Sequence, residues 1–240
     1  GKTTTALFIA KKFAEDNILL LTYNARLKDE TRTKIKTYKI KNLEAHTYHS
    51  FCVRYYDERS RTDCVMHDII NNKMELKNKM QYDIIIFDEA QDITPLYYKI
   101  AHKIYVDNEK NAKICVFGDK HQSIYGFNNA DERFLTYADK LFDFNNFSWA
   151  KSQLTMSFRL TNQISDFINS CVIKENRIRT TNKEGEKPKY IYCDTYGIGP
   201  FNCVKEYLEK GYNPDDIFIL APSVRNGTPI RKLENKIKIH

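Results

Sequence analysis

The 240-residue sequence contains no apolar run near the roughly 20 residues that a bilayer-spanning helix needs, which excludes an integral membrane protein. Its six cysteines form no CxxC pair and show no cysteine–histidine spacing typical of zinc ligands. Scattered thiols of this kind indicate a reducing compartment and packing in the core rather than disulfides. We therefore expect an intracellular protein, cytoplasmic or nuclear. No signal peptide is visible, although the chain starts without methionine, so this absence says little.

The sequence also lacks internal repeats and low-complexity tracts, and its composition is that of a folded protein. Hydrophobic residues make up 42% of the chain, enough for a sizeable core, and 29% of the residues are charged. Thirty-eight Lys and Arg residues against 31 Asp and Glu residues give a formal charge of +7. This excess favours a polyanionic partner without identifying one.

Short apolar runs alternate with stretches of helical periodicity, which predicts an α/β fold with a parallel sheet covered on both faces. Helices are expected from the start of the chain to about Ala14 and from Pro95 to about Tyr105, and strands at 18–21, 84–87 and 114–117. The polar stretch 143–148 is the predicted domain boundary. Beyond it we expect strands near Leu154 and at 190–193 and 217–220, with helices at 162–172, at 201–210 and from Pro229. Two α/β units in tandem are predicted.

The chain opens with Gly1-Lys2-Thr3-Thr4 directly before the first predicted helix. In a phosphate-binding loop, backbone N–H groups and a helix N-terminus face the phosphates, Lys neutralises the β/γ oxygens, and the Thr hydroxyl ligates magnesium. Only the last three of that motif's positions are present here, so these residues alone would more often form an ordinary helix start.

Two acidic residues follow a buried strand at Asp88-Glu89-Ala90-Gln91-Asp92. The apolar run 84–87 places both carboxylates at the carboxyl end of its strand, where ligands bind in open α/β sheets. The first acid is suited to holding magnesium through water, and the second to polarising the attacking water. A solvated turn is the alternative, but the upstream GKT favours a nucleotide site.

A third strand ends in Gly118-Asp119-Lys120-His121-Gln122, with Tyr125 and Phe127 a few residues on. A Gln at such a strand end is able to hydrogen-bond a γ-phosphate or its neighbouring water, and thereby to distinguish ATP from ADP. In isolation, these residues would more often form a turn whose aromatic side chains pack into the core.

Six motifs in order make the chain resemble superfamily 1 DNA helicases of the UvrD/Rep/PcrA type: GKT at 1–3, TYN at 22–24, TYHSF at 47–51, DEAQD at 88–92, GDKHQSIYGF at 118–127 and LTMSFR at 154–159. The LTYN form at 21–24 is closer to the F-box DNA helicase branch. The family fold is a tandem of RecA-like P-loop NTPase domains with ATP between them. The resemblance implies a first domain at 1–147, truncated at its N-terminus, and a partial second domain at 148–240.

The resemblance also implies how each residue would act on ATP and Mg²⁺. Lys2 would contact the β/γ-phosphates, with Gly1 and Thr4 in the same loop, and Thr3 and Asp88 would hold magnesium. Glu89 would be the base, Gln122 the γ-phosphate sensor, and Arg159 an arginine that reaches the γ-phosphate like an arginine finger. Without the resemblance, a surface salt bridge would be the ordinary interpretation of Arg159.

For nucleic acid, the resemblance implies that Phe127 stacks on a base, with Tyr125 beside it. Tyr23, Asn24, Thr47 and His49 match positions near the single-strand backbone. Seven basic residues against two acidic ones between Arg26 and Lys41 provide a further flank for phosphates, although its outer lysines fit a solvated face equally well.

The resulting hypothesis is an ATP-dependent translocase and helicase that acts on single-stranded DNA and duplex junctions, with 3′–5′ polarity taken from the resemblance alone, in DNA repair or recombination. Since half of the phosphate loop is missing, we expect these 240 residues alone to be feeble or inactive as an ATPase. The alternatives are a nucleic-acid-binding module without motor activity and an RNA helicase of the same superfamily.

Overall fold

The computed structural model describes residues 1–144 and 147–239, which pack as two units. Unit 1 comprises residues 1–159 and 169–181, and unit 2 comprises residues 160–168 and 182–240. The predicted boundary stretch 143–148 includes residues 145 and 146, which lie outside the described residues, so the boundary stays a prediction. Within the described ranges, no helix combines the length and apolar character that crossing a membrane requires.

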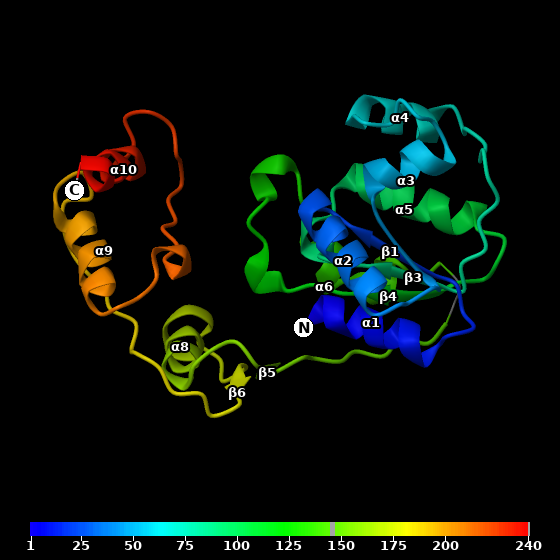
Figure 1. Cartoon of the computed structure of the whole chain (residues 1–240). Coiled ribbons are helices and arrows are strands. Elements are labelled where there is room, and N and C mark those ends of the chain that lie inside the picture. The colour runs from blue at the N-terminus through cyan, green and yellow to red at the C-terminus, as the bar shows by residue number, and fades with distance from the viewer. Residues whose placement is uncertain (145–146, 240) are drawn as a thin grey trace. The chain divides into compact units, whose positions relative to one another are not determined.

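A four-stranded, all-parallel sheet with the order β2-β1-β3-β4 forms the centre of unit 1 (Figure 1). Its strands are β1 (Ile18–Thr22), β2 (Leu43–Thr47), β3 (Ile84–Phe87) and β4 (Lys113–Val116). The register aligns Leu21 of β1 with Phe87 of β3, and Phe87 with Val116 of β4. The carboxyl ends of β1, β3 and β4 therefore meet along one edge of the sheet.

Helices cover both faces of this sheet (Figure 1). The alternation of short apolar runs with stretches of helical periodicity predicted this arrangement. Leu19 and Leu21 pack into one core with α3 (Tyr48–Tyr55), α4 (Asp63–Asn71) and α5 (Pro95–Asp107). Ile18 and Leu20 pack into a second core with α1 (Lys2–Lys12) and α2 (Ala25–Thr37). Because successive side chains of a strand point to opposite faces, an unbroken apolar strand supplies both cores.

Short elements complete unit 1. Three 3₁₀ turns follow strands β3 and β4: η1 (Ala90–Asp92), η2 (Lys120–Gln122) and η3 (Gly126–Asn128). The helices α6 (Arg133–Thr136) and α7 (Ala138–Leu141) come next. Two short strands, β5 (Met156–Ser157) and β6 (Arg179–Thr180), pair in parallel.

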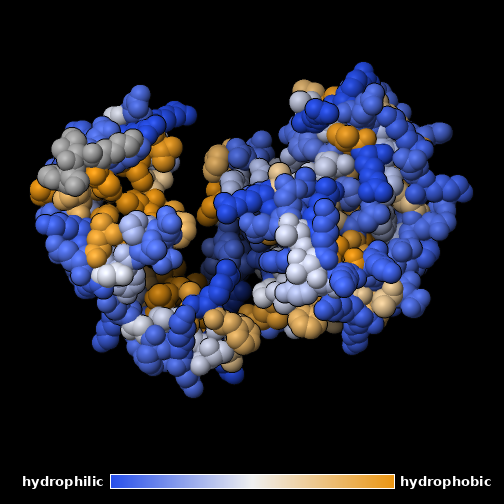
Figure 2. Space-filling model, in the orientation of Figure 1, coloured by the Kyte–Doolittle hydropathy of each residue, from blue (hydrophilic) through white to orange (hydrophobic). Residues whose placement is uncertain are grey.

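Unit 2 contains α8 (Asn162–Phe167), η5 (Pro214–Asp216), α9 (Gly199–Glu209) and α10 (Pro229–Ile239). The π-helical segment η4 (Ile168–Ile173) continues α8. The predicted strands at 190–193 and 217–220 are wrong, because both segments are irregular. A strand needs a neighbour for its backbone groups and side chains, whereas Tyr190 is 93% exposed and Leu220 92%. Figure 2 shows such hydrophobic residues at the surface of the part that carries α9 and α10.

The six cysteines are all free. Their packing in the core is confirmed only in part. Cys52 is buried, Cys115 and Cys203 are half-buried, and Cys64, Cys171 and Cys193 are exposed.

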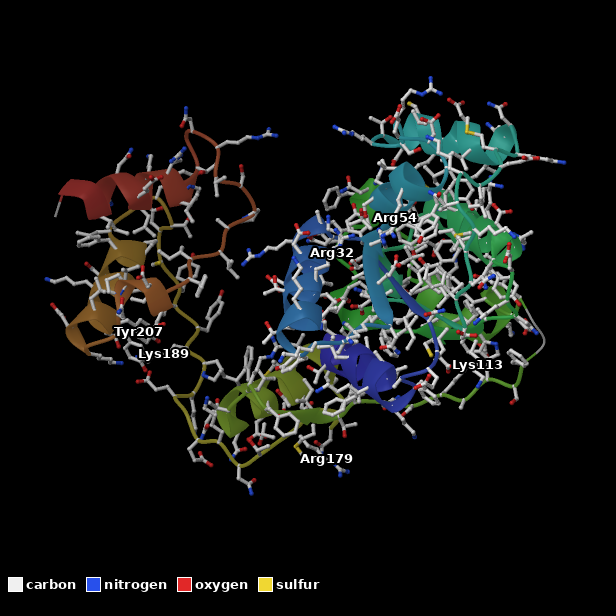
Figure 3. All side chains as sticks on the ribbon, turned by 45° about the vertical axis from the view of Figure 1, so that its right-hand side comes forward. Arg32, Arg54, Lys113, Arg179, Lys189 and Tyr207 are labelled. Atoms are coloured by element: carbon white, nitrogen blue, oxygen red, sulfur yellow. The ribbon has the colours of Figure 1, made fainter. Side chains whose placement is uncertain are left out.

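Two arginines pack around the edge strand β2 (Figure 3). This strand was not predicted from the sequence. Arg32 from α2 donates its Nε–H to the carbonyl oxygen of Ala45 at 2.8 Å. Arg54 from α3 forms an ion pair with Glu44 at 3.3 Å. These contacts stabilise a strand whose polar residues interrupt the apolar pattern.

Candidate nucleotide and nucleic-acid site

The turn after β3 positions the two adjacent carboxylates. The backbone N–H of Asp88 donates to the carbonyl of Leu21, which extends the pairing with β1 by one residue. Glu89 then adopts a left-handed conformation with φ of 54°, which non-glycine residues adopt at a cost in free energy. The chain returns to the sheet as the N–H of Ala90 donates to the carbonyl of Phe117.

Asp88 is a buried carboxylate with an unsatisfied oxygen. The residue is only 1% exposed. Its Oδ1 accepts the N–H of Glu89 at 3.0 Å, whereas its Oδ2 has no hydrogen-bond partner among the described residues. Burial, reinforced by the neighbouring Glu89 charge, raises the pKa of Asp88 to about 6. An ionised, unpaired buried oxygen favours a cation as its missing partner.

Magnesium fits this donor set. Within residues 1–144 and 147–239, no three His, Cys, Asp or Glu side chains cluster as a protein-only metal site. Mg²⁺ typically keeps several waters and takes one or two carboxylates together with substrate phosphates. Asp88 supplies such a carboxylate, and Thr3 lies at the start of α1 beside Lys2. No direct hydrogen bond joins Thr3 to Asp88 in the described structure.

Lys2 and Glu89 form an ion pair at 2.8 Å, and each side chain is about one fifth exposed, at 20% and 22%. The charge of Lys2 also acts to lower the pKa values of Asp88, Asp92 and Asp119, although burial raises those of Asp88 and Asp92 overall. Lys2 therefore lies close to the acidic residues that follow strands β3 and β4. The ion pair and these electrostatic effects bring Lys2 together with the DEAQD carboxylates, whereas the implied approach of Arg159 to the same site stays a prediction.

Gln91 links the two strand ends. Its Nε2–H₂ group donates to Glu89 at 2.9 Å and to Asp92 at 3.3 Å, while its Oε1 accepts the backbone N–H of Asp119 at 3.0 Å. Gln122 in turn donates from Nε2 to Asp119 at 3.0 Å. A continuous chain of polar contacts thus runs from Lys2 to Gln122.

Asp92 is a second buried carboxylate of this site. Burial and the nearby Glu89 charge raise the pKa of Asp92 to about 6, and its Oδ1 has no partner among the residues described. No role was predicted for Gln91, Asp92 or Asp119. The signal was present, since all three directly follow predicted strands within the DEAQD and GDKHQ motifs.

A cavity of about 370 Å³ joins this chain to predicted nucleic-acid residues. Its lining includes Glu89 and Gln122 together with Tyr23, Asn24 and Tyr125. The remaining lining residues are Leu27, Gln91, Asp92, His121 and Ile124. The residues at the strand ends and the predicted nucleic-acid residues therefore line one cavity in unit 1.

Aromatic side chains form a row at this cavity. The ring centroids of Tyr23 and Tyr125 lie 5.4 Å apart, and those of Tyr125 and Phe127 lie 6.0 Å apart. Phe127 is 79% exposed, so the alternative of a core aromatic is wrong for this residue. An exposed ring beside two partly covered ones offers a stacking surface for a base.

Three other predicted nucleic-acid residues carry structural roles. Asn24 caps α2 by accepting the N–H of Arg26 at 2.8 Å. Thr47 is buried and caps α3 in a capping box with Ser50. His49 lies 2.9 Å from a carboxylate oxygen of Asp63.

Among the described residues, no side-chain hydrogen bond or ion pair joins the remaining predicted residues to the polar chain. Arg159 is exposed, and its backbone N–H donates to Ser157 at 3.4 Å. In the described structure, no side-chain contact joins it to Lys2, Glu89 or Gln122. Gly1 is the N-cap of α1, and Thr4 is exposed on its first turn.

Comparison with known proteins gives matches to helicases. Residues 60–143 match the UvrD/REP helicase N-terminal domain. The chain is 31% identical over 233 residues to the ATP-dependent DNA helicase PcrA of Staphylococcus aureus, covering 88% of this chain and 30% of PcrA. It is 36% identical over 89 residues to F-box DNA helicase protein 1 of Schizosaccharomyces pombe, covering 37% of this chain and 9% of that protein.

A third relative is the probable DNA helicase II homolog of Mycoplasma capricolum, 31% identical over 161 residues, which cover 62% of this chain and 21% of the relative. The chain thus spans less than a third of the length of each of these relatives. The parallel sheet flanked by helices is consistent with a helicase RecA-like domain. The matches and the motif order together make the chain similar to UvrD-like superfamily 1 helicases, and its residues 60–143 correspond to the UvrD/REP helicase N-terminal domain.

Proposed function

We propose that the protein is an ATP-dependent DNA helicase that couples ATP hydrolysis to 3′–5′ movement on single-stranded DNA and to duplex unwinding. The observation that carries the proposal is the polar chain from Lys2 to Gln122 along the strand ends, which shares a cavity with Tyr23 and Tyr125. The names of the relatives, which include DNA helicases, support DNA as the substrate. DNA repair or recombination inside the cell is part of the proposal.

In this proposal, Lys2 leaves Glu89 to bind the β/γ-phosphates, and Glu89 is freed to polarise the attacking water. Asp88, together with Thr3, holds Mg²⁺, which supplies positive charge to the phosphates when bound. Gln122 contacts the γ-phosphate or the water beside it. Catalysis then consists of positioning and charge stabilisation, with no covalent intermediate.

The proposal extends to a tandem arrangement, with residues 1–147 as the first RecA-like domain and 148–240 as part of a second. Arg159 would reach the γ-phosphate when the domains close on ATP, and hydrolysis would remove the contacts that favour closure. Bases would pass over Phe127 and Tyr125 by sequence-tolerant stacking, with Asn24, Thr47 and His49 near the backbone.

The test is ATP hydrolysis by the complete gene product with and without single-stranded DNA. Glu89→Gln preserves the acceptor for Gln91 but removes the charge, so DNA-stimulated turnover is expected to fall at least about 100-fold. ATP affinity should stay equal or increase, because Lys2 loses its competing ion pair. Glu15→Gln, at an exposed position, is the matched control.

Three outcomes would contradict parts of the proposal. Unchanged turnover in Glu89→Gln removes Glu89 from its role. DNA binding that is indifferent to ATP analogues, with no hydrolysis, identifies a binding module without motor activity. Stronger stimulation by RNA than by a matched DNA oligomer identifies an RNA helicase. Unwinding of duplexes with 3′ or 5′ single-stranded tails reads the polarity.

A further inference from the structure

Arg177 contacts the site from a segment that no sequence motif marked. Its Nη1 donates to Oδ1 of Asp119 at 3.1 Å, and the two residues are 58 positions apart in the sequence. The side chains of Arg177 and Asp119 are 26% and 23% exposed, close to the values for the Lys2–Glu89 pair. A largely covered pair is less screened by solvent than a pair at the surface.

The backbone around Arg177 is fixed by a buried amide. Asn169 accepts the N–H of Arg177 at 3.3 Å and that of Ile178 at 3.0 Å, and donates to the carbonyl of Ile178 at 2.9 Å. Asn169 is only 8% exposed. The hydrogen bonds from Asn169 therefore fix the backbone of the loop that carries Arg177.

This loop is also tied to the strand that leads to Arg159. Two residues after Arg177, β6 begins and pairs in parallel with β5, aligning Met156 with Arg179 and Ser157 with Thr180. β5 ends two residues before Arg159. The position of Arg177 is thus coupled through one strand pair to the segment that carries the predicted arginine finger.

At its other end, Arg177 contacts the residue that holds Gln122. One carboxylate oxygen of Asp119, Oδ1, accepts from Arg177 and from the backbone N–H of His121, and the other, Oδ2, accepts from the Gln122 side chain. Burial acts to raise the pKa of Asp119. The hydrogen bond from the His121 amide and the charge of Arg177 outweigh this effect, so the pKa lies below its ordinary value. The carboxylate thus stays ionised and keeps both oxygens as acceptors.

We propose that Arg177 is a positioning residue that, through Asp119, fixes the side chain of Gln122 for the γ-phosphate and couples it to the β5 segment preceding Arg159. The inference rests on the proposed function, because it assigns Gln122 the sensing role. Arg177 itself does not contact the nucleotide in this proposal. Its removal leaves Asp119 without one charged partner and lets the Gln122 amide reorient.

The experiment is a set of variants of the complete gene product, assayed for DNA-stimulated ATP hydrolysis: Arg177→Ala, Gln122→Ala, both together, Arg177→Lys and Arg179→Ala. Arg179 is the matched control, because it is an exposed arginine on the adjacent strand (Figure 3). Arg177→Ala should lower kcat about tenfold, corresponding to about 1.4 kcal/mol, and change the KM for ATP less than about threefold. Thermal unfolding of every variant checks that it is folded.

The double variant distinguishes positioning from a merely structural role. If Arg177 acts through Gln122, then Arg177→Ala should change kcat less than about twofold in the Gln122→Ala background. Arg177→Lys should recover part of the activity, since only one guanidinium nitrogen contacts Asp119. Arg179→Ala should keep the activity of the unaltered protein.

The inference is overturned if the two kcat losses multiply, or if Arg177→Ala hydrolyses ATP as well as Arg179→Ala does. In either case the unaltered protein still shows DNA-dependent turnover that Glu89→Gln abolishes, so the proposed function stands. If the unaltered protein shows no DNA-dependent turnover, the proposed function fails, and the inference fails with it.

Discussion

Replacing Asp88 by asparagine should stabilise the ligand-free protein progressively more as the pH rises. The folded carboxyl has a pKa of about 6 against an ordinary value of 3.8, so the folded state binds more protons between these values and loses stability as pH rises through them. Linkage gives a penalty of about 3 kcal/mol at pH 8 and about 1.6 kcal/mol at pH 5. An uncharged amide at this position would remove that penalty.

The amide brings a packing cost of its own, since its nitrogen replaces the oxygen that has no partner. This cost does not titrate and is the same at both pH values. The free energy of unfolding of Asp88→Asn, relative to the unaltered protein, should therefore rise by about 1.4 kcal/mol between pH 5 and pH 8.

The assay is denaturant unfolding at both pH values, without nucleotide or Mg²⁺. Asp68→Asn, at an exposed position on α4, is the control. A difference for Asp88→Asn that is equal at the two pH values, or that falls toward pH 8, would refute the reasoning that burial of an unpaired charge destabilises this site.

Thr47→Ala removes the cap of α3 and should lower the free energy of unfolding by about 1 kcal/mol in urea titrations; unchanged stability with weakened DNA binding would instead make the hydroxyl a strand contact. Phe127→Ala, at an exposed ring, should leave the melting temperature unchanged and weaken single-stranded DNA binding by about 1–3 kcal/mol in anisotropy titrations, and equal affinity would remove the ring from stacking. Burial lowers the pKa of His46 in the folded state below its ordinary value of 6.5. As the pH falls below 6.5, the unfolded chain therefore binds a proton at His46 more readily than the folded state does, and the free energy of unfolding decreases. His46→Gln should lose less stability between pH 7 and pH 5 than the unaltered protein in thermal melts, and equal losses would exclude this cause.

Strands β1 and β3 were predictable because they are buried on both faces. β1 and β3 are unbroken apolar runs, which is the pattern of a central parallel strand, and the acids after β3 follow from it directly. β2 escaped prediction because Glu44 and His46 interrupt its pattern. These side chains hydrogen-bond each other at 3.3 Å, and the sequence does not show such a pairing.

The links between strand ends were beyond sequence reasoning for a similar reason. The motifs named Glu89 and Gln122, but Gln91 joins Glu89 to Asp119 across two neighbouring strands, and that contact depends on the register. Local propensity favoured strands at 190–193 and 217–220, yet these segments form none, because a strand also needs a partner. Arg177 had no local signal at all.

The ion pair between Lys2 and Glu89 has a consequence for the resting enzyme under the proposed function. While no triphosphate is present, the base and the phosphate-binding cation neutralise each other, so neither is available to a stray water or anion. Arrival of the triphosphate draws Lys2 away and, in the same event, releases the carboxylate. Binding of the triphosphate would thus itself free Glu89 for hydrolysis, and without triphosphate the ion pair would keep the site inactive.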